Sequence, residues 1–198
     1  MSESAPTSVL FICTGNVCRT PMAVGFFNHR SSELGLDDHA TSVGLWRNGE
    51  PATTHGVSVM AELGIDTSHH RSRVLDATDL DAPDLIIGLA REHVREAVVL
   101  DTSVLERTFT LKELVRLAEE PGGARLVGVG ESVRAWALRL SGGRRPSDLL
   151  GQHPEDDVAD PIGRSRRAYE DTATEIGDLI DRMLRVMHPE VAQGRVSA

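Results

Sequence analysis

The sequence predicts an α/β fold built on a parallel sheet. Short apolar segments rich in β-branched residues alternate along the chain with longer segments whose apolar residues recur at helical spacing. Glycine and proline residues separate many of these segments. The 198 residues are enough for one domain with a substantial core, and 40% hydrophobic with 26% charged residues is an ordinary globular composition.

The elements can be assigned in chain order. Residues 8–13 (SVLFIC) form an apolar run that ends in a turn, which is typical of a buried strand. Pro21 fits the first turn of the following helix, because its missing N–H costs nothing there, and Gly35 marks the helix end. Further strands are expected at 41–44, 85–87 and 107–110, and further helices at 54–63, 90–98, 110–117 and 163–187.

Residues 120–158 interrupt this alternation. The stretch contains several glycines and prolines around one segment of helical spacing, 133–140. So long a connection is unusual in a compact domain and is often a lid or a mobile loop. We therefore expect an insertion with one short helix.

The basic pairs Arg144–Arg145 and Arg166–Arg167 are expected to be solvated surface charge.

The composition excludes several classes of function. Lys and Arg total 21 against 30 Asp and Glu, and the net charge of -9 disfavours general binding of nucleic acid or anionic membranes. Two cysteines exclude a disulfide scaffold and a four-cysteine zinc site, and no His/Asp/Glu cluster has metal-ligand spacing. The apolar run 9–13 is too short for a signal peptide or a membrane span. We expect a cytoplasmic protein without metal or organic cofactor.

The segment from Cys13 to Pro21 carries the chemistry. Cys13 and Arg19 bracket a glycine-containing loop between the first strand and the first helix. Loop N–H groups and the helix N-terminus favour a dianion, and Arg19 can grip two phosphate oxygens at once. The same positive surroundings favour the thiolate of Cys13, and Thr20 is placed to donate a hydrogen bond to it.

The run VLFICTGNVCRTPMA resembles the low-molecular-weight protein-tyrosine phosphatases. Four later segments resemble that family in its order: Ser42-Val43-Gly44, residues 68–73 (SHHRSR), Asp84-Leu85-Ile86 and Asp160-Pro161. The resemblance covers about residues 8–119 and 158–187. It implies a flavodoxin-like fold in which a four-stranded parallel sheet of order 2-1-3-4 has helices on both faces. Residues 1–198 would then form one phosphatase domain with an insertion at about 120–158.

The resemblance also implies residue roles. Cys13 would be the nucleophile that forms a phosphocysteine, and Arg19 would hold the phosphoryl oxygens through the transition state. Asp160 would be the general acid for the leaving group and then the base for the hydrolytic water. The residues expected to contact substrate are Thr14, Gly15, Asn16, Val17, Cys18, Thr20, Trp46 and Ile162.

Supporting roles follow from the same resemblance. Asn16 would hold the loop in a left-handed conformation that asparagine tolerates, supported by Ser42 and His70. Thr20 stands where the family usually has serine. Cys18 resembles a second loop cysteine that can form a reversible disulfide with Cys13 and protect it from overoxidation.

The implied function is hydrolysis of phosphotyrosine in proteins, by a monomer or weak homodimer that binds no nucleic acid or membrane. Ile162 replaces the aromatic residue that usually follows Asp-Pro, which predicts a weaker grip on the substrate ring, with Trp46 as the opposite wall. Phosphoarginine hydrolysis is an alternative, although that branch carries threonine where this chain has Val17. Arsenate reduction is a further alternative, but in the thioredoxin-linked branch it needs cysteines downstream of Cys18, and this sequence has none there. A catalytically weak phosphopeptide-binding module is the remaining alternative.

Overall fold

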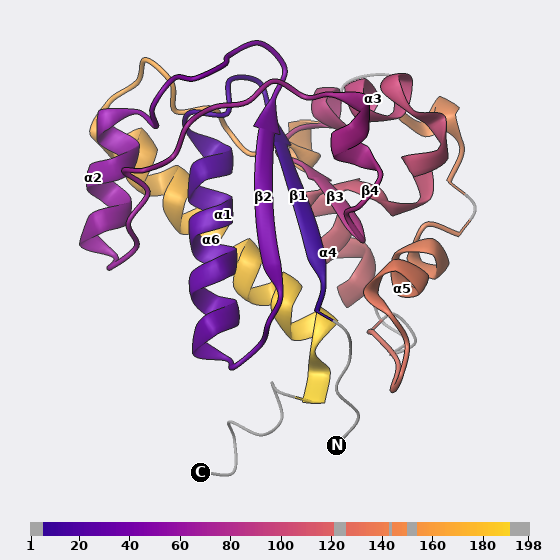
Figure 1. The fold of residues 1–198 in the computed structure, drawn as a ribbon. Coiled ribbons are helices and arrows are strands. Elements are labelled where there is room, and N and C mark those ends of the chain that lie inside the picture. Colours follow the sequence, from indigo (N-terminus) through magenta and orange to yellow (C-terminus); the bar gives the residue numbers. More distant parts are fainter. Residues whose placement is uncertain (1–5, 121–125, 143, 150–153, 191–198) are drawn as a thin grey trace.

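A parallel sheet forms the centre of the molecule (Figure 1). The computed structural model describes residues 6–120, 126–142, 144–149 and 154–190. Its strands are β1 (Ser8–Cys13), β2 (His39–Gly44), β3 (Leu85–Gly88) and β4 (Thr108–Thr110). They pair in parallel in the order β2-β1-β3-β4, which confirms the predicted topology.

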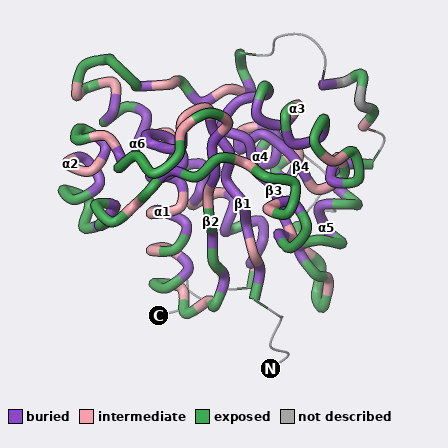
Figure 2. The backbone as a smooth tube through the Cα atoms, turned by 45° about the horizontal axis from the view of Figure 1, so that its top comes forward, coloured by how far each residue is buried: buried purple, intermediate pink, exposed green. Residues whose placement is uncertain are grey.

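Helices cover both faces of the sheet. They are α1 (Arg19–Glu33), α2 (Thr54–Glu62), α3 (Arg91–Leu100), α4 (Leu111–Glu119), α5 (Val133–Leu140) and α6 (Arg166–Met187). Alternate residues of β1 point to opposite faces: Val9 and Phe11 pack with α1, α4 and α6, whereas Leu10 and Ile12 pack with α3. Both β1 and β3 are therefore buried almost throughout (Figure 2).

The predicted element boundaries hold to within a few residues. The last helix shows the clearest difference, because it begins at Arg166 and not at residue 163. Gly163 has a φ of 71°, in the left-handed region, so the chain turns there before the helix starts. Among the described residues, no helix is both long and apolar enough to cross a membrane.

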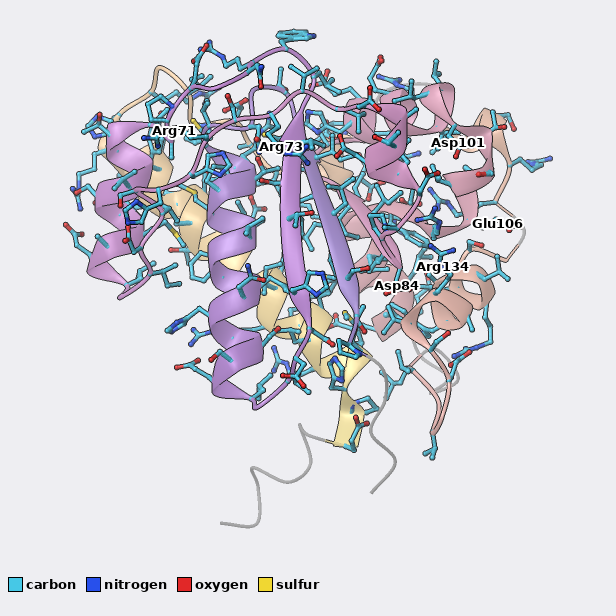
Figure 3. The ribbon with its side chains drawn as sticks, in the orientation of Figure 1. Arg71, Arg73, Asp84, Asp101, Glu106 and Arg134 are labelled. Carbon is cyan, nitrogen blue, oxygen red and sulfur yellow. The ribbon has the colours of Figure 1, made fainter. Side chains whose placement is uncertain are left out.

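The insertion packs against the sheet edge through α5. Trp136 is fully buried in the main core. Arg134 reaches the start of β3, where its guanidinium donates to the Pro83 carbonyl at 2.9 Å and lies 3.7 Å from the Asp84 carboxylate (Figure 3). The expected helix at 133–140 is confirmed, while residues 121–125, 143 and 150–153 of the insertion lie outside the described residues.

The expectation of solvated charge is wrong for Arg144. Its guanidinium lies 4.5 Å from the centroid of the Phe109 ring and donates to the Thr108 carbonyl at 2.7 Å. It also pairs with Glu113 at 3.3 Å. An aromatic ring and a carbonyl acceptor at β4 bind this arginine, and neither is visible from the charge pattern near residue 144.

Candidate active site

The loop that joins β1 to α1 surrounds the sulfur of Cys13 with hydrogen-bond donors. The Asn16 N–H donates to Cys13 Sγ at 3.2 Å, and Thr20 Oγ1 lies 3.1 Å from the same sulfur. Thr20 Oγ1 already accepts a hydrogen bond from the Asn16 side chain, so its own hydrogen can point to the sulfur. Cys13 is buried, and both of these groups lie within hydrogen-bonding distance of its sulfur.

Asn16 holds the loop in shape. Among the described residues, Asn16 is the one non-glycine residue with a positive φ, which is 52°. Its side-chain amide donates to Thr20 Oγ1 and to Ser42 Oγ, both at 2.8 Å, and accepts from the Arg73 N–H at 2.9 Å. His70 Nε2 lies 2.6 Å from the Asn16 carbonyl oxygen. Because a carbonyl oxygen can only accept a hydrogen bond, Nε2 carries the hydrogen and donates it. These contacts secure a strained residue from three segments of the chain.

The end of β2 approaches the loop very closely at Gly44. A Cβ atom on Gly44 would lie 2.8 Å from both Cβ and the backbone N of Asn16. The next residue, Leu45, donates its N–H to the Thr14 carbonyl at 2.9 Å. A glycine at position 44 is therefore a steric requirement of this loop.

Arg19 lies at the base of the same site. Its NH1 donates to the Val158 carbonyl at 3.1 Å, while NH2 donates to Thr14 Oγ1 at 3.0 Å and to Asp160 Oδ2 at 2.6 Å. Its Nε is buried and has no hydrogen-bond partner within the described part of the chain. A buried donor without an acceptor is costly, and an incoming oxyanion can relieve that cost.

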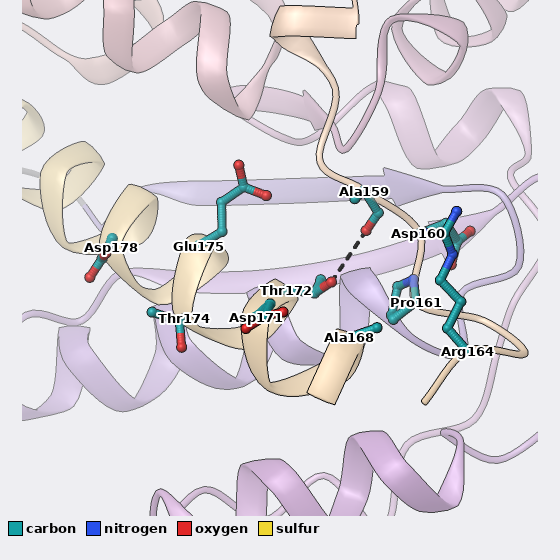
Figure 4. A pocket seen from close by; sticks show the side chains of 10 residues that line it. All are labelled: Ala159, Asp160, Pro161, Arg164, Ala168, Asp171, Thr172, Thr174, Glu175 and Asp178. Carbon is teal, nitrogen blue, oxygen red and sulfur yellow. Dashed lines mark hydrogen bonds between the residues drawn. The ribbon is translucent and has the colours of Figure 1, made fainter. Parts of the chain in front are cut away.

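The segment before α6 positions Asp160. Thr172 Oγ1 of α6 donates to the Ala159 carbonyl at 3.4 Å, next to Asp160 (Figure 4). The Ile162 N–H donates to Asp160 Oδ1 at 3.0 Å. Upstream, the buried Asp156 carboxylate pairs with Arg91 of α3 at 2.5 Å, so the acid-bearing segment is fixed at both ends.

A pocket of about 130 Å³ lies above Cys13. It is lined by Cys13, Thr14, Gly15, Val17, Cys18, Arg19, Trp46, Arg47, Asp160 and Ile162. Trp46 is 77% exposed and Ile162 43% exposed. Asn16 and Thr20, also expected to contact substrate, are fully buried and absent from this lining. The structure thus brings together Cys13, Arg19 and Asp160 and places Asn16, Ser42 and His70 behind the loop.

Sequence reasoning missed a polar cluster beside Arg19. Thr14 Oγ1, which accepts from Arg19, lies 3.2 Å from Glu92 Oε1 and 3.0 Å from His93 Nε2. Burial lowers the pKa of His93, and the hydrogen bond from this imidazole helps lower the pKa of Glu92 to about 2. The available signal was the position of Glu92 and His93 in the first turn of a helix that follows a buried strand, at the same sheet edge as Cys13.

Cys18 lines the same pocket as Cys13, at the start of α1. Its sulfur is 3.5 Å from Thr53 Oγ1 and 3.6 Å from the Tyr169 hydroxyl. Burial raises the pKa of the Cys18 thiol. Cys13 and Cys18 are both free thiols. In the described part of the chain, no group of three His, Cys, Asp or Glu side chains could hold a metal ion.

A buried cysteine that ends the first strand of a parallel sheet, with an arginine opening the next helix, is the arrangement expected of a cysteine-dependent phosphatase. The sequence model of one family in that class, described as low molecular weight phosphotyrosine protein phosphatase, matches residues 8–121. That match covers more than half of the chain, and the protein belongs to this family.

Individual relatives show the same similarity. The chain is 26% identical to a protein-arginine-phosphatase of Bacillus subtilis over 89% of its own length and 94% of that protein. It is 38% identical to low molecular weight protein-tyrosine phosphatase A of Mycobacterium tuberculosis, over 46% of its own length and 58% of that protein. A crystal structure of a low molecular weight protein tyrosine phosphatase from T. tengcongensis superposes with a TM-score of 0.67 at 34% identity, covering 90% of this chain and 98% of that chain.

Proposed function

We propose that this phosphatase hydrolyses phosphotyrosine in proteins through a phosphocysteine intermediate. The observation that carries the proposal is the convergence of Cys13, Arg19 and Asp160 on one small pocket. A nucleophile, a cation for the phosphoryl oxygens and a carboxyl group for the leaving oxygen are the three groups that the reaction needs.

In the first step the Cys13 thiolate attacks phosphorus. The S–P bond forms while the bond from phosphorus to the tyrosine oxygen breaks, and Asp160 donates a proton to that oxygen. The Nε of Arg19 and the loop N–H groups bind the equatorial oxygens, on which the negative charge is spread.

In the second step Asp160 accepts a proton from water, and the water oxygen attacks phosphorus. The S–P bond breaks, inorganic phosphate leaves and the Cys13 thiolate is restored. The Thr20 hydroxyl stabilises this leaving thiolate through the contact at 3.1 Å. When a peroxide oxidises Cys13 to a sulfenic acid, the Cys18 thiol would condense with it and release water, and the resulting reversible disulfide would protect the nucleophile from further oxidation.

The pocket lining favours a phosphoaryl substrate. Val17, Trp46 and Ile162 present apolar surface, which suits a phenyl ring. The guanidinium of phosphoarginine is polar, and Val17 offers it no hydrogen-bonding group. Hydrolysis of protein phosphoarginine is the second candidate, because the relative named for that activity matches nearly the whole chain.

Arsenate reduction is disfavoured because no cysteine follows Cys18 to relay a disulfide. The phosphopeptide-binding alternative is disfavoured because nucleophile and acid lie in the same pocket.

We also propose that residues 1–198 form one phosphatase domain with an insertion at about 120–158. It would act in the cytoplasm on phosphorylated proteins, as a monomer or weak homodimer without nucleic-acid or membrane partners.

A kinetic comparison tests the proposal. Matched peptides carrying phosphotyrosine, phosphoserine or phosphoarginine would be given to the wild type and to Cys13→Ser and Asp160→Asn. We expect the highest kcat/KM for phosphotyrosine and no turnover by Cys13→Ser. Faster release of phosphate from phosphoarginine would support the second candidate, and wild-type turnover by Cys13→Ser would refute both.

A further inference from the structure

An apolar groove adjoins the catalytic pocket. It measures about 470 Å³ and is lined by Leu45, Trp46, Leu75, Glu92, Glu96, Val99 and Leu100. Its apolar residues are unusually accessible: Val99 is 79% exposed and Leu100 45% exposed. We propose that this groove binds the polypeptide next to the phosphorylated residue, and that it selects a large apolar side chain adjacent to a basic one.

The first argument is continuity. Trp46 lines both the catalytic pocket and the groove, so the two share one wall. The catalytic pocket is small and accommodates the phosphorylated side chain, whereas the backbone of a protein substrate must continue across its rim. At ~3.3 Å per residue, an extended chain that leaves over Trp46 reaches the groove within about one to three residues.

The second argument is chemical. Exposed apolar patches with a polar border commonly mark binding surfaces. Glu92, Glu96, Val99 and Leu100 are spaced at i, i+4, i+7 and i+8 on α3, so they share one helix face. The low pKa of Glu92 keeps its carboxylate charged at any neutral pH, and Glu96 adds a second exposed carboxylate one turn away. An apolar floor bordered by two carboxylates complements a Leu or Ile that stands next to a Lys or Arg.

This inference rests on the proposed function, and its test separates the two. Three phosphotyrosine peptides would differ in the flanking residues alone: Leu-Arg, Leu-Glu and Ser-Ser, each placed on both sides of the phosphoresidue. The same sequences would be made with phosphoarginine. The small substrate p-nitrophenyl phosphate, which cannot reach the groove, reports catalysis by itself.

Two exposed groove residues would be changed, each with a matched control. Val99→Ser is compared with Val129→Ser, which alters an exposed valine of the insertion, and Glu96→Lys with Glu106→Lys outside the groove. We expect Val99→Ser to lower kcat/KM for the Leu-Arg peptide by ~3–10-fold. Glu96→Lys should reverse the preference between Leu-Arg and Leu-Glu. Neither change should alter hydrolysis of p-nitrophenyl phosphate, and both controls should behave as wild type.

Equal kcat/KM for the three peptides with the wild type would overturn the proposal. So would a dimer, measured by light scattering, that Val99→Ser dissociates, because the groove would then bind a second copy of the chain. If neither phosphopeptide series is hydrolysed, calorimetry with Cys13→Ser measures peptide binding directly. Tighter binding of the Leu-Arg peptide in that experiment supports peptide binding in the groove even if the proposed catalytic activity has failed. Equal binding of the three peptides refutes peptide selection by the groove, whatever the catalytic activity is.

Discussion

Arg19 NH2 and Asp160 Oδ2 lie 2.6 Å apart, although 141 residues separate them in the sequence. In our proposal this ion pair joins two groups that have separate tasks during the reaction. A phosphoryl dianion competes for the guanidinium, and the carboxyl group then becomes available to the leaving oxygen. The Arg19 side chain is buried and donates a hydrogen bond to the Val158 carbonyl, which holds it in place. The Asp160 side chain is 34% exposed, so it is the partner better able to move.

The first prediction concerns the acid. Asp160→Asn removes the proton donor, and kcat for phosphotyrosine peptides should fall by ~10²–10⁴-fold. The loss should be smaller for p-nitrophenyl phosphate, because its leaving group needs less protonation. Steady-state kinetics with both substrates measures the difference. Asp171→Asn, an exposed carboxylate on α6, is the control. Equal losses for the two substrates would contradict the assignment of Asp160 as general acid.

Much of this site could be predicted from local sequence. The Cys13–Arg19 spacing, the buried strand before it and the helix after it determine where the loop lies, because parallel strands present their carboxyl ends at one edge. The partners of Thr14 could not be predicted in this way. Glu92 and His93 follow β3, which the predicted strand order already places beside β1. Which of their atoms reach Thr14 depends on side-chain conformations at the start of α3, and the sequence around Thr14 does not encode these. The burial of Arg144 was missed for the same reason, since Phe109 and Glu113 bind it from β4 and α4.

The second prediction concerns loop support. Ser42→Ala removes the acceptor for the Asn16 amide at 2.8 Å. Losing one net hydrogen bond costs about 1 kcal/mol, and kcat/KM should fall by about fivefold if that energy holds the loop in its reactive shape. Thr41→Ala, on the exposed face of the same strand, should leave kcat/KM unchanged. An unaltered kcat/KM in Ser42→Ala would show that Asn16 keeps its conformation without this contact.

The third prediction concerns pH and stability. The pKa of His70 is below its ordinary value of 6.5, mainly through burial and also through the nearby Arg71 charge, against the opposing hydrogen bond to Asn16. Between the folded pKa and pH 6.5, the His70 imidazole is therefore more protonated in the unfolded chain than in the folded chain. The free energy of unfolding consequently decreases as the pH falls from 6.5 toward the folded pKa. His93, whose pKa is also lowered, acts in the same direction.

Urea unfolding at several pH values between 7.5 and 5 tests this sign. His70→Gln keeps an N–H donor for the Asn16 carbonyl but does not titrate, so its stability should fall less steeply below pH 6.5. The change in slope is limited to about 1.4 kcal/mol per pH unit for one proton. His69→Gln is the control, because that side chain is 96% exposed. A slope in His70→Gln as steep as in the wild type would refute a low pKa for His70.

The last prediction separates the two chemical steps at Thr20. Thr20→Val keeps the shape of the side chain but removes the hydroxyl beside Cys13 Sγ, whereas Thr20→Ser keeps the hydroxyl. A hydrogen bond to a charged group contributes about 1.5–3 kcal/mol, so Thr20→Val should lower kcat by ~10–100-fold. The thiolate is the leaving group when the phosphocysteine is hydrolysed, so this step should be slowed most. Rapid-quench experiments should then show phosphoenzyme accumulating in Thr20→Val and little of it in Thr20→Ser. Equal phosphoenzyme levels in the two variants would mean that the N–H groups of the loop suffice to stabilise the sulfur.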